Sequence, residues 1–413
     1  MKKIVLINIS GTDRPGLTSS LAEILATHGA RILDIGQAVV HEILTLGMLV
    51  EVAGSDEFTL LKKDLIVKAH ELELKIKLTP VSEESFDNWV ESQAKFRFVI
   101  SVLGRAVTSA QLAAISSAIS SHGFNIDRID RLSGRLSLTG RPENRKACIE
   151  LDLSGEKDTS AGLRAALIEM TQRFEVDIAF QRESIYRRNR RLVAFDMDST
   201  LIQAEVIDEL AKLHGVGDQV SAITAAAMRG ELDFKQSLAR RVGLLRGVRA
   251  EQLQDLVGSI ALAEGAERLI STLKVLGYKT AILSGGFHFF GKHLQARLGI
   301  DYVFANELEI AGGELTGRLA SEIVDGKKKA ELLASIARKE NISLDQVVAV
   351  GDGANDLPML DIAGMGIAYH AKPLVRESAS HAVSHLGLDS ILYLLGVRDR
   401  DLDRAEFRSR AAH

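Results

Sequence analysis

Cysteine is almost absent from this chain of 413 residues, which contains a single copy, Cys148. One cysteine excludes an internal disulfide and fits a reducing cytosol. Because Cys148 stands in the run Ala-Cys-Ile-Glu-Leu-Asp-Leu, we expect a packed strand residue there rather than a reactive thiol. No hydrophobic run approaches the roughly 18–20 residues that a membrane helix needs. The formal net charge of −4 also lacks the basic excess that is typical of nucleic-acid binders.

The first ten residues lack a complete export signal. Lys2 and Lys3 precede an apolar stretch, as in a signal peptide, but the stretch is short and Asn8 interrupts it. No small-residue cleavage site follows. We therefore expect a cytoplasmic protein that has neither a nucleic-acid nor a membrane partner.

What is present is an ordinary globular composition, 46% hydrophobic and 26% charged. The length is typical of about two to four domains. Residues 3–9 and 35–53 have strand-like apolar patterns, and between them 16–29 has apolar residues at helical spacing. A second helix over 57–72 and a strand over 72–80 complete the order β-α-β-β-α-β. This order is the ferredoxin-like pattern of an α+β domain.

The same pattern recurs about 95 residues later, as expected of an internal repeat. The stretches His28-Gly-Ala-Arg-Ile-Leu-Asp-Ile and His122-Gly-Phe-Asn-Ile-Asp-Arg-Ile occupy the same place in each unit. The elements expected in the second unit are strands at 96–103, 125–133, 146–154 and 176–180 and helices at 109–122 and 160–174.

The remaining chain, from Leu192 to about Val397, alternates strands with helices, which predicts an α/β domain with a doubly wound parallel sheet. A linker over 183–191 precedes it. This linker contains the basic cluster Arg187–Arg191, which we interpret as a solvated segment, with a nucleic-acid-binding arm as the alternative. The predicted domains are 1–84, 95–182 and 192–398, the last with a helical cap at about 203–270, followed by a charged tail at 399–413 that we expect to fray.

The clearest indication of a catalytic site is the stretch 192–202, Leu-Val-Ala-Phe-Asp-Met-Asp-Ser-Thr-Leu-Ile. The apolar run 192–195 is typical of a buried parallel strand. It delivers Asp196 and Asp198 at its carboxyl end, where α/β enzymes hold ligands. Two carboxylates at such a short separation repel each other unless a cation lies between them or one of them keeps its proton. Taken alone, the pair could also be two solvated acids in a loop.

Three further motifs follow in the chain, each at or near the end of a predicted strand. They are Ser284-Gly-Gly, Lys329 and Gly351-Asp-Gly-Ala-Asn-Asp356. Together with Asp196-Met-Asp-Ser-Thr, they resemble the four motifs of haloacid-dehalogenase-type phosphotransferases, in the order of that family. The sequence Gly351-Asp-Gly is not a dinucleotide fingerprint, because Asp356 stands where the third glycine is required.

The resemblance implies an enzyme that hydrolyses phosphomonoesters through an aspartyl-phosphate. It implies that Asp196 is the nucleophile and Asp198 the general acid and base. The implied cofactor is Mg²⁺, held by the Asp196 side chain, the Asp198 carbonyl and the Asp352 side chain, with Asp356 orienting the ligands. The residues implied to hold the substrate are Ser284 and Gly285 for the phosphoryl oxygens, Lys329 for a further charge, and Asn355.

The predicted cap resembles that of the family branch that acts on phosphoserine, in the stretch from Met228 to Arg241. A zwitterionic amino-acid substrate needs an acid for its ammonium group and a base for its carboxylate. Glu205 would supply the first and Arg241 the second, while Met228 and Phe234 would form an apolar wall. The alternatives are a helix N-terminal acid for Glu205, a surface charge for Arg241 and helix packing for Met228 and Phe234.

The two ferredoxin-like units resemble ACT domains, which bind amino acids and commonly do so between copies. The first unit carries the ligand loop Gly11-Thr-Asp-Arg-Pro-Gly16, so Asp13 and Gly16 are candidate effector-binding residues. The second unit has Gly104-Arg-Ala-Val-Thr-Ser-Ala and lacks the Asp-x-Pro-Gly element. We therefore expect a homodimer that is regulated by an amino acid, with L-serine as the hypothesis. The alternative is that these units serve dimerisation alone.

Two other functions remain open on the sequence alone. The same chemistry could act on another small phosphorylated amino acid or hydroxy acid instead of phosphoserine. The chain could also be an amino-acid sensor with a vestigial phosphatase domain, although the intact set of motif residues speaks against it. The expected reaction is the hydrolysis of O-phospho-L-serine to L-serine and phosphate, as the last step of serine biosynthesis.

Overall fold

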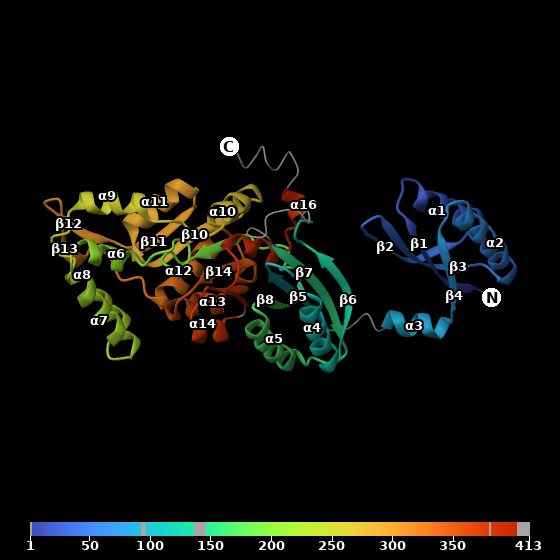
Figure 1. Ribbon diagram of the computed structural model, residues 1–413, viewed down its shortest axis with the longest axis horizontal. Coiled ribbons are helices and arrows are strands. Elements are labelled where there is room, and N and C mark those ends of the chain that lie inside the picture. The colour runs from blue at the N-terminus through green and yellow to red at the C-terminus, as the bar shows by residue number, and fades with distance from the viewer. Residues whose placement is uncertain (1, 92–95, 136–145, 380, 403–413) are drawn as a thin grey trace. The chain divides into compact units, whose positions relative to one another are not determined.

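The structure is a computed structural model, and it describes residues 2–91, 96–135, 146–379 and 381–402. The chain divides into two compact units, Met1–Lys95 and Phe96–His413, which are described separately (Figure 1). Within the described ranges, no helix combines the length and the apolar character needed to cross a membrane.

The first unit has an antiparallel four-stranded sheet with the order β2-β3-β1-β4. The expected order β-α-β-β-α-β is confirmed, because alternate residues of the central strands are buried beneath two helices. The edge strand β2 is exposed along nearly its whole length. The elements are β1 (Lys3–Thr12), α1 (Leu17–Thr27), β2 (Arg31–Val40), β3 (Ile43–Val52), α2 (Ser55–Glu71) and β4 (Lys75–Val81). A further helix, α3 (Glu83–Glu91), was not expected.

The second unit begins with the predicted repeat. Its antiparallel sheet has the order β6-β7-β5-β8, which is equivalent, strand for strand, to the first. The helix α4 begins with a capping box formed by Thr108 and Gln111. The elements are β5 (Phe96–Gly104), α4 (Ser109–Ser121), β6 (Phe124–Arg131), β7 (Ala147–Gly155), α5 (Ser160–Phe174) and β8 (Asp177–Arg182).

The α/β domain contains a six-stranded parallel sheet with the order β11-β10-β9-β14-β15-β16, as the alternation of strands and helices predicted. All four residues of β9 are buried, because helices cover both faces of the sheet. The strands are β9 (Leu192–Phe195), β10 (Lys279–Phe287), β11 (Tyr302–Asn306), β14 (Val347–Gly351), β15 (Met365–Tyr369) and β16 (His381–Val383). The helices around them are α10 (Ala266–Val275), α11 (His288–Leu298), α12 (Gly326–Lys339), α13 (Leu357–Ile362) and α14 (Pro373–Ser378), with short α15 (Ile391–Leu394) near the end.

The cap is built from two separate segments of chain. Its helices are α6 (Val206–Leu213), α7 (Gly217–Met228), α8 (Phe234–Gly243) and α9 (Ala250–Ser259). A hairpin of β12 (Leu308–Ala311) and β13 (Glu314–Leu319), which the sequence did not predict, lies beside α8 and α9 (Figure 1). It is joined to the α8–α9 connection by backbone hydrogen bonds from Gly247 N to Leu315 O (2.9 Å) and from Leu315 N to Val248 O (2.8 Å).

The connection 183–191 is not solvated throughout, contrary to the expectation. Arg187 is 3% exposed and forms a buried ion pair with Glu150 of β7. Arg190 is 8% exposed and donates to the backbone carbonyls of Asp345 and Gly364. Two of the basic side chains therefore tie the repeat to the α/β domain, which leaves only part of the cluster for solvent.

The start of the charged tail is anchored rather than frayed. The helix α16 (Asp399–Leu402) places Asp399 where it accepts hydrogen bonds from Gly134 N (2.7 Å) and from the Tyr393 hydroxyl (2.8 Å). Arg268 pairs with the same carboxylate at 3.1 Å. The rest of the predicted tail, 403–413, lies outside the described residues.

Candidate active site

The carboxyl ends of three neighbouring strands bring the sequence motifs to one place. Asp196 follows β9, Ser284 lies near the end of β10, and Asp352 follows β14. Since β9 lies between β10 and β14, the three residues meet at one edge of the sheet. The backbone N–H of Asp196 donates to the carbonyl of Val350 at 2.8 Å, so the strand pairing itself fixes the position of this carboxylate.

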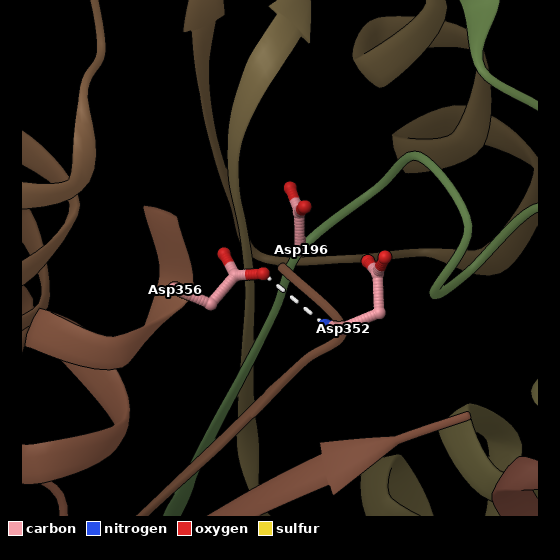
Figure 2. Close-up of side chains that lie close together, drawn as sticks. All are labelled: Asp196, Asp352 and Asp356. Atoms are coloured by element: carbon pink, nitrogen blue, oxygen red, sulfur yellow. Dashed lines mark hydrogen bonds between the residues drawn. The ribbon is translucent and has the colours of Figure 1, made fainter. Parts of the chain in front are cut away.

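Three carboxylates converge at this edge, those of Asp196, Asp352 and Asp356 (Figure 2). One oxygen from each lies within 4.8 Å of the others. Asp356 is fully buried, and its Oδ2 accepts hydrogen bonds from the backbone N–H groups of Asp352 (3.1 Å) and Gly353 (2.9 Å). A set of hard oxygen ligands in this arrangement fits a divalent cation such as Mg²⁺.

Lys329 is fully buried and supplies the positive charge that the chain itself brings to this cluster. Its Nζ lies 2.8 Å from Asp196 Oδ1 and 2.7 Å from Asp356 Oδ1. Burial lowers the pKa of Lys329, but the Asp196 and Asp356 carboxylates outweigh it, so the pKa is raised and the amine stays charged. The neighbouring Lys327 and Lys328 instead pair with Glu331 and Glu322 away from the cluster.

Three acids of the site, Asp352, Asp356 and Asp198, have raised pKa values. Burial, together with the charges of Asp196 and Asp356, raises the pKa of Asp352 to about 7. Burial and Asp196 also raise the pKa of Asp356 to about 6, against the opposing effect of Lys329. Burial, then Glu205 and Asp196, raises the pKa of Asp198 well above its usual range. Negative charge is therefore in excess at this site, and a bound cation would offset it.

The backbone of the Ser284-Gly-Gly turn lies very close to side chains of the cap and of the first motif. Ser284 is 1% exposed, and its Oγ accepts a hydrogen bond from Gly286 N at 2.9 Å. A Cβ at Gly285 would lie 2.9 Å from Phe234 Cζ, and one at Gly286 would lie 2.4 Å from Asp198 Oδ2. A side chain at Gly286 would collide with Asp198, and one at Gly285 would displace the Phe234 ring of the cap, so both positions favour glycine.

Phe234 and Glu205 from the cap reach the site. Phe234 contacts the turn at Gly285 and packs on the core. Glu205 is exposed, and its Oε1 accepts a hydrogen bond from the Ser199 hydroxyl at 2.9 Å. Glu205 stands at the N-cap position of α6, but its side chain makes no capping hydrogen bond. Helix capping therefore does not explain why an acid occupies this position.

Arg241 lies on α8, partly buried, and its Nε has no hydrogen-bond partner in the described part of the chain. Burial lowers its pKa, while Asp208, Glu205 and Asp198 act in the opposite direction. A donor of this guanidinium therefore remains for a ligand. Met228, by contrast, is 64% exposed at the end of α7, so it does not form part of a closed wall in this structure.

Asn355 lies beside the acidic cluster, in the turn between Asp352 and Asp356. It is partly buried, and a Cβ at Gly353 would lie 2.2 Å from its Oδ1. Asp13 and Gly16 belong to the first unit. Gly16 begins α1 with a φ of 92°, a left-handed conformation that favours glycine, and Asp13 is exposed.

Three supporting residues were not singled out from the sequence. Ser199 holds Glu205, and the Thr200 hydroxyl donates to Asp352 Oδ1 at 3.1 Å. Both stand within the first motif, so their positions could have been noticed. Asn306, fully buried at the end of β11, donates from Nδ2 to the Gly285 carbonyl (2.7 Å) and accepts from Val324 N (2.8 Å) at Oδ1. Only the three-dimensional fold brings its two partners together.

Comparison with known families matches three segments of the chain. Residues 3–79 and 97–181 match ACT domain models, and residues 193–361 match the haloacid dehalogenase-like hydrolases. These segments coincide with the two ferredoxin-like sheets and with the α/β domain. The resemblances expected from the motifs are therefore confirmed at the level of the family.

Two curated relatives align with nearly the whole chain. The phosphoserine phosphatase SerB2 of Mycobacterium tuberculosis is 40% identical, over 98% of this chain and 96% of its own. A phosphoserine phosphatase of Streptomyces coelicolor is 41% identical, over 97% of this chain and 94% of its own. Among solved structures, a HAD family hydrolase from Salmonella enterica serovar Typhi has a TM-score of 0.62 at 32% identity, covering 72% of this chain and 98% of the other.

Proposed function

The chain belongs to the phosphoserine phosphatase family of haloacid dehalogenase-like hydrolases, and we propose that Asp196 carries out the first chemical step of its reaction. The reaction is the hydrolysis of O-phospho-L-serine to L-serine and phosphate. An oxygen of the Asp196 carboxylate attacks phosphorus, and the bond from phosphorus to the serine oxygen breaks. The observation that supports this role is the position of Asp196 at the end of β9, 2.8 Å from Lys329.

Asp198 is the proposed proton donor and acceptor. Burial and the neighbouring acids raise its pKa, which favours the protonated carboxyl group, and the departing serine alkoxide takes up that proton as the bond breaks. The resulting Asp198 carboxylate then removes a proton from the water that attacks the aspartyl-phosphate. That attack releases phosphate and restores both acids to their starting state.

The phosphoryl oxygens are held by Ser284, by the backbone at Gly285 and by Lys329, with Asn355 at the side of the site. Donors that are already fixed before the reaction stabilise the charge that develops in the transition state. Ser284 and Lys329 are both buried, which strengthens their interaction with an anion. The amino-acid part of the substrate lies against the cap, with its ammonium group at Glu205 and its carboxylate at Arg241.

Mg²⁺ is the proposed cofactor, and the oxygen-rich cluster described above fits it. Its ligands would be the side chains of Asp196 and Asp352 and the backbone carbonyl of Asp198. When bound, it would offset the repulsion between these carboxylates and the substrate phosphate. Asp356, whose two oxygens already accept hydrogen bonds from Lys329 and from backbone N–H groups, would position the ligands from behind.

The first ACT domain is the proposed effector site. Asp13 and Gly16 lie in the turn that leads into α1, where the backbone at Gly16 is left-handed and a side chain is absent. We propose L-serine, the reaction product, as the effector that lowers activity. The location we propose is the cytoplasm, where a free thiol such as Cys148 stays reduced, and the role is the last step of serine biosynthesis.

A homodimer is the proposed assembly, and the edge strand β2 is its proposed contact. Unpaired backbone groups on an edge strand are a template for pairing with another chain. The exposed apolar residues there and at the start of the next strand are Ile32, Ile35, Val39, Val40 and Ile43. A second copy of this chain would bury that surface.

A panel of phosphoesters tests the proposed function, with phosphate release measured for each ester with and without Mg²⁺ and with and without L-serine. We expect kcat/KM to be highest for O-phospho-L-serine, activity to require the cation, and added serine to lower it. A higher kcat/KM for another small phosphorylated acid would identify that acid, instead of phosphoserine, as the substrate. Phosphate release that is absent under every condition would indicate a sensor whose phosphatase domain is inactive.

A further inference from the structure

The first turn of α8 makes two contacts with the α/β core. Phe234 begins the helix and lies against the Ser284-Gly-Gly turn, where a Cβ at Gly285 would be 2.9 Å from Phe234 Cζ. The next residue, Lys235, also reaches the core, because its Nζ lies 3.2 Å from Asp325 Oδ2. One cap helix is therefore joined to the core by an apolar ring and, beside it, by an ion pair.

The ion pair between Lys235 and Asp325 has no counterpart elsewhere in the cap helices. Within residues 206–259, no other ion pair reaches the described part of the α/β core. The remaining ion pairs of these helices join two residues of the cap, and they are Lys212–Glu209, Arg229–Glu231 and Arg249–Glu251. Lys235 is therefore the residue whose charge links the cap helices to the core.

Asp325 stands at the N-cap position of α12, the helix that carries Lys329. Its Oδ1 accepts a hydrogen bond from Lys328 N at 2.9 Å, while its Oδ2 pairs with Lys235. Its carbonyl accepts a hydrogen bond from Lys329 N, also at 2.9 Å. The ion pair therefore connects α8 of the cap to the same helical turn that places the Lys329 ammonium beside Asp196.

Asp325 retains its negative charge for this contact. The hydrogen bond from Lys328 N lowers its pKa most, and Lys235 lowers it further, against the effect of burial. The Lys328 ammonium lies 2.7 Å from Glu322, so it does not take the place of Lys235. The Asp325 side chain is 24% exposed and that of Lys235 is 57% exposed. An ion pair at this exposure changes an equilibrium by about two- to fivefold, which can bias the cap between two positions without fixing it in one.

The helix α8 extends this bias to the substrate site. Arg241, the proposed partner of the substrate carboxylate, lies on the same helix, about two turns beyond Lys235. A short helix moves as one unit, so a shift at its first turn displaces the Phe234 ring and the Arg241 guanidinium together. Binding residues that are already in position favour substrate binding, whereas a cap that opens more often weakens it.

We propose that the Lys235–Asp325 ion pair stabilises the closed position of the cap and thereby positions Phe234 and Arg241 over the site. Lys235 is a positioning residue, because it acts through α8 and contacts no reacting atom. The proposal rests on the proposed phosphatase function, in which Arg241 binds the carboxylate of phosphoserine. Loss of the pair favours an open cap, which weakens substrate binding but leaves the chemical step in the closed complex unchanged.

Steady-state kinetics of the full-length enzyme with Lys235→Gln test the proposal. We expect KM for phosphoserine to rise about two- to fivefold, with kcat no lower than that of wild type. Lys235→Arg keeps the charge and should return KM to within about 1.5-fold of wild type. The control is Lys212→Gln, which removes an exposed lysine that pairs within the cap, and its KM should equal that of wild type. A fall in kcat with KM unchanged in Lys235→Gln would overturn the proposal.

A double-mutant cycle identifies the partner of Lys235. Asp325→Asn removes the charge but keeps an oxygen that can cap α12, so the start of the helix is preserved. In this background, Lys235→Gln should change KM by less than about 1.3-fold, because the pair is already broken. An undiminished effect of Lys235→Gln in the Asp325→Asn background would also overturn the proposal, since Lys235 would then act through another group.

Hydrogen exchange of the ligand-free full chain measures the position of the cap independently of turnover. We expect backbone amides in peptides spanning 229–237 to exchange at least about twofold faster in Lys235→Gln than in wild type or Lys212→Gln. This difference would remain even if phosphoserine were not the substrate, so failure of the proposed function and failure of the ion pair are distinguishable. Equal exchange in all three proteins would show that the pair does not hold the cap.

Discussion

Lys329 keeps its ammonium group inside the protein with two carboxylates in contact. An unpaired buried ammonium would lose its proton or destabilise the fold. Asp196 and Asp356 therefore stabilise the charge of Lys329, and Lys329 in turn stabilises theirs. The helix α12 places this group, because Asp325 caps its first turn by accepting from Lys328 N at 2.9 Å. At the scale of single residues, charge balance and catalysis therefore depend on the same contacts.

Replacement of the proposed nucleophile by its amide isostere should abolish turnover. Asp196→Asn preserves the shape of the side chain, but the amide oxygen does not attack phosphorus as a carboxylate does. We expect kcat to fall by about 10³-fold or more, with the fold retained. Phosphate release and thermal melting measure the two effects. Asp218→Asn, an exposed acid on α7, is the control and should behave as wild type. Retention of a tenth of the activity would show that another group is the nucleophile.

Removal of Arg241 should impair the amino-acid substrate selectively. For Arg241→Ala we expect kcat/KM on phosphoserine to fall about 100-fold, because a charged contact to the carboxylate is lost. For p-nitrophenyl phosphate, which has no carboxylate, the loss should be less than about fivefold. Arg240→Ala, which changes the exposed neighbour, serves as the control. Equal losses on both esters would mean that Arg241 does not bind the carboxylate.

At the scale of elements, Asn306 joins three segments that are distant in sequence. It links the end of β11 to the Ser284-Gly-Gly turn and to the stretch before α12 through its two buried hydrogen bonds. For Asn306→Ala, two backbone groups lose their partner, which should lower stability by about 2 kcal/mol. We also expect kcat/KM to fall at least tenfold, because Gly285 is no longer fixed. Urea unfolding and phosphate release check this, with exposed Asn189→Ala as the control. Unchanged kinetics would show that the turn is held by other contacts.

The junction of α1 and α2 in the first unit depends on a histidine. His28 Nδ1 lies 2.6 Å from Glu57 Oε1 and His28 Nε2 lies 2.8 Å from Asp64 Oδ2. The hydrogen bonds to Asp64 and then Glu57 raise the pKa of His28 above its usual value. Stability from this contact is therefore complete below about pH 6.5 and is lost as the pH rises through the raised pKa.

Accordingly, His28→Gln should lower stability at pH 6 and have little effect at pH 9. Because both carboxylates are substantially exposed, we expect a loss of about 1 kcal/mol or less. Trp89 is the one tryptophan of the chain and lies in α3 of the same unit, so its fluorescence can follow urea unfolding of this unit. In a Glu57→Gln/Asp64→Asn background the pH dependence should disappear. A loss of equal size at both pH values would indicate that packing, not charge, stabilises the junction.

The elements of the fold follow from sequence to different degrees. Periodicity predicted both ferredoxin-like sheets, because their buried faces alternate with exposed ones, and contiguous motifs predicted Asp196, Ser284, Lys329 and Asp352. The hairpin β12–β13 was not predicted, because its strands are short and its partners lie elsewhere in the chain. The burial of Arg187 and Arg190 could not be predicted either, since their partners, Glu150 and two backbone carbonyls, are close only in the folded molecule.

At the scale of the whole molecule, the proposed dimer contact on the exposed strand β2 can be tested with charged substitutions. Val40 is 73% exposed and Ile35 is 50% exposed, and both belong to β2. The double variant Ile35→Glu/Val40→Glu places two negative charges on the strand that would be buried between copies, so it should weaken the proposed dimer toward a monomer. Light scattering with size-exclusion chromatography gives the mass. Val67→Glu, on the exposed side of α2, should leave the mass unchanged. An unaltered dimer in the double variant would place the contact on another surface.

The division of the cap between helices α6–α9 and the hairpin β12–β13 constrains how substrate preference can be transplanted between related enzymes. A chimaera that exchanges only residues 203–260 would leave the donor helices facing a foreign hairpin, and the hydrogen bonds of Leu315 with Gly247 and Val248 would have to re-form with a mismatched partner. Successful exchange therefore requires moving residues 308–319 along with the helices. Selection for a new ester should likewise produce paired changes in these two stretches.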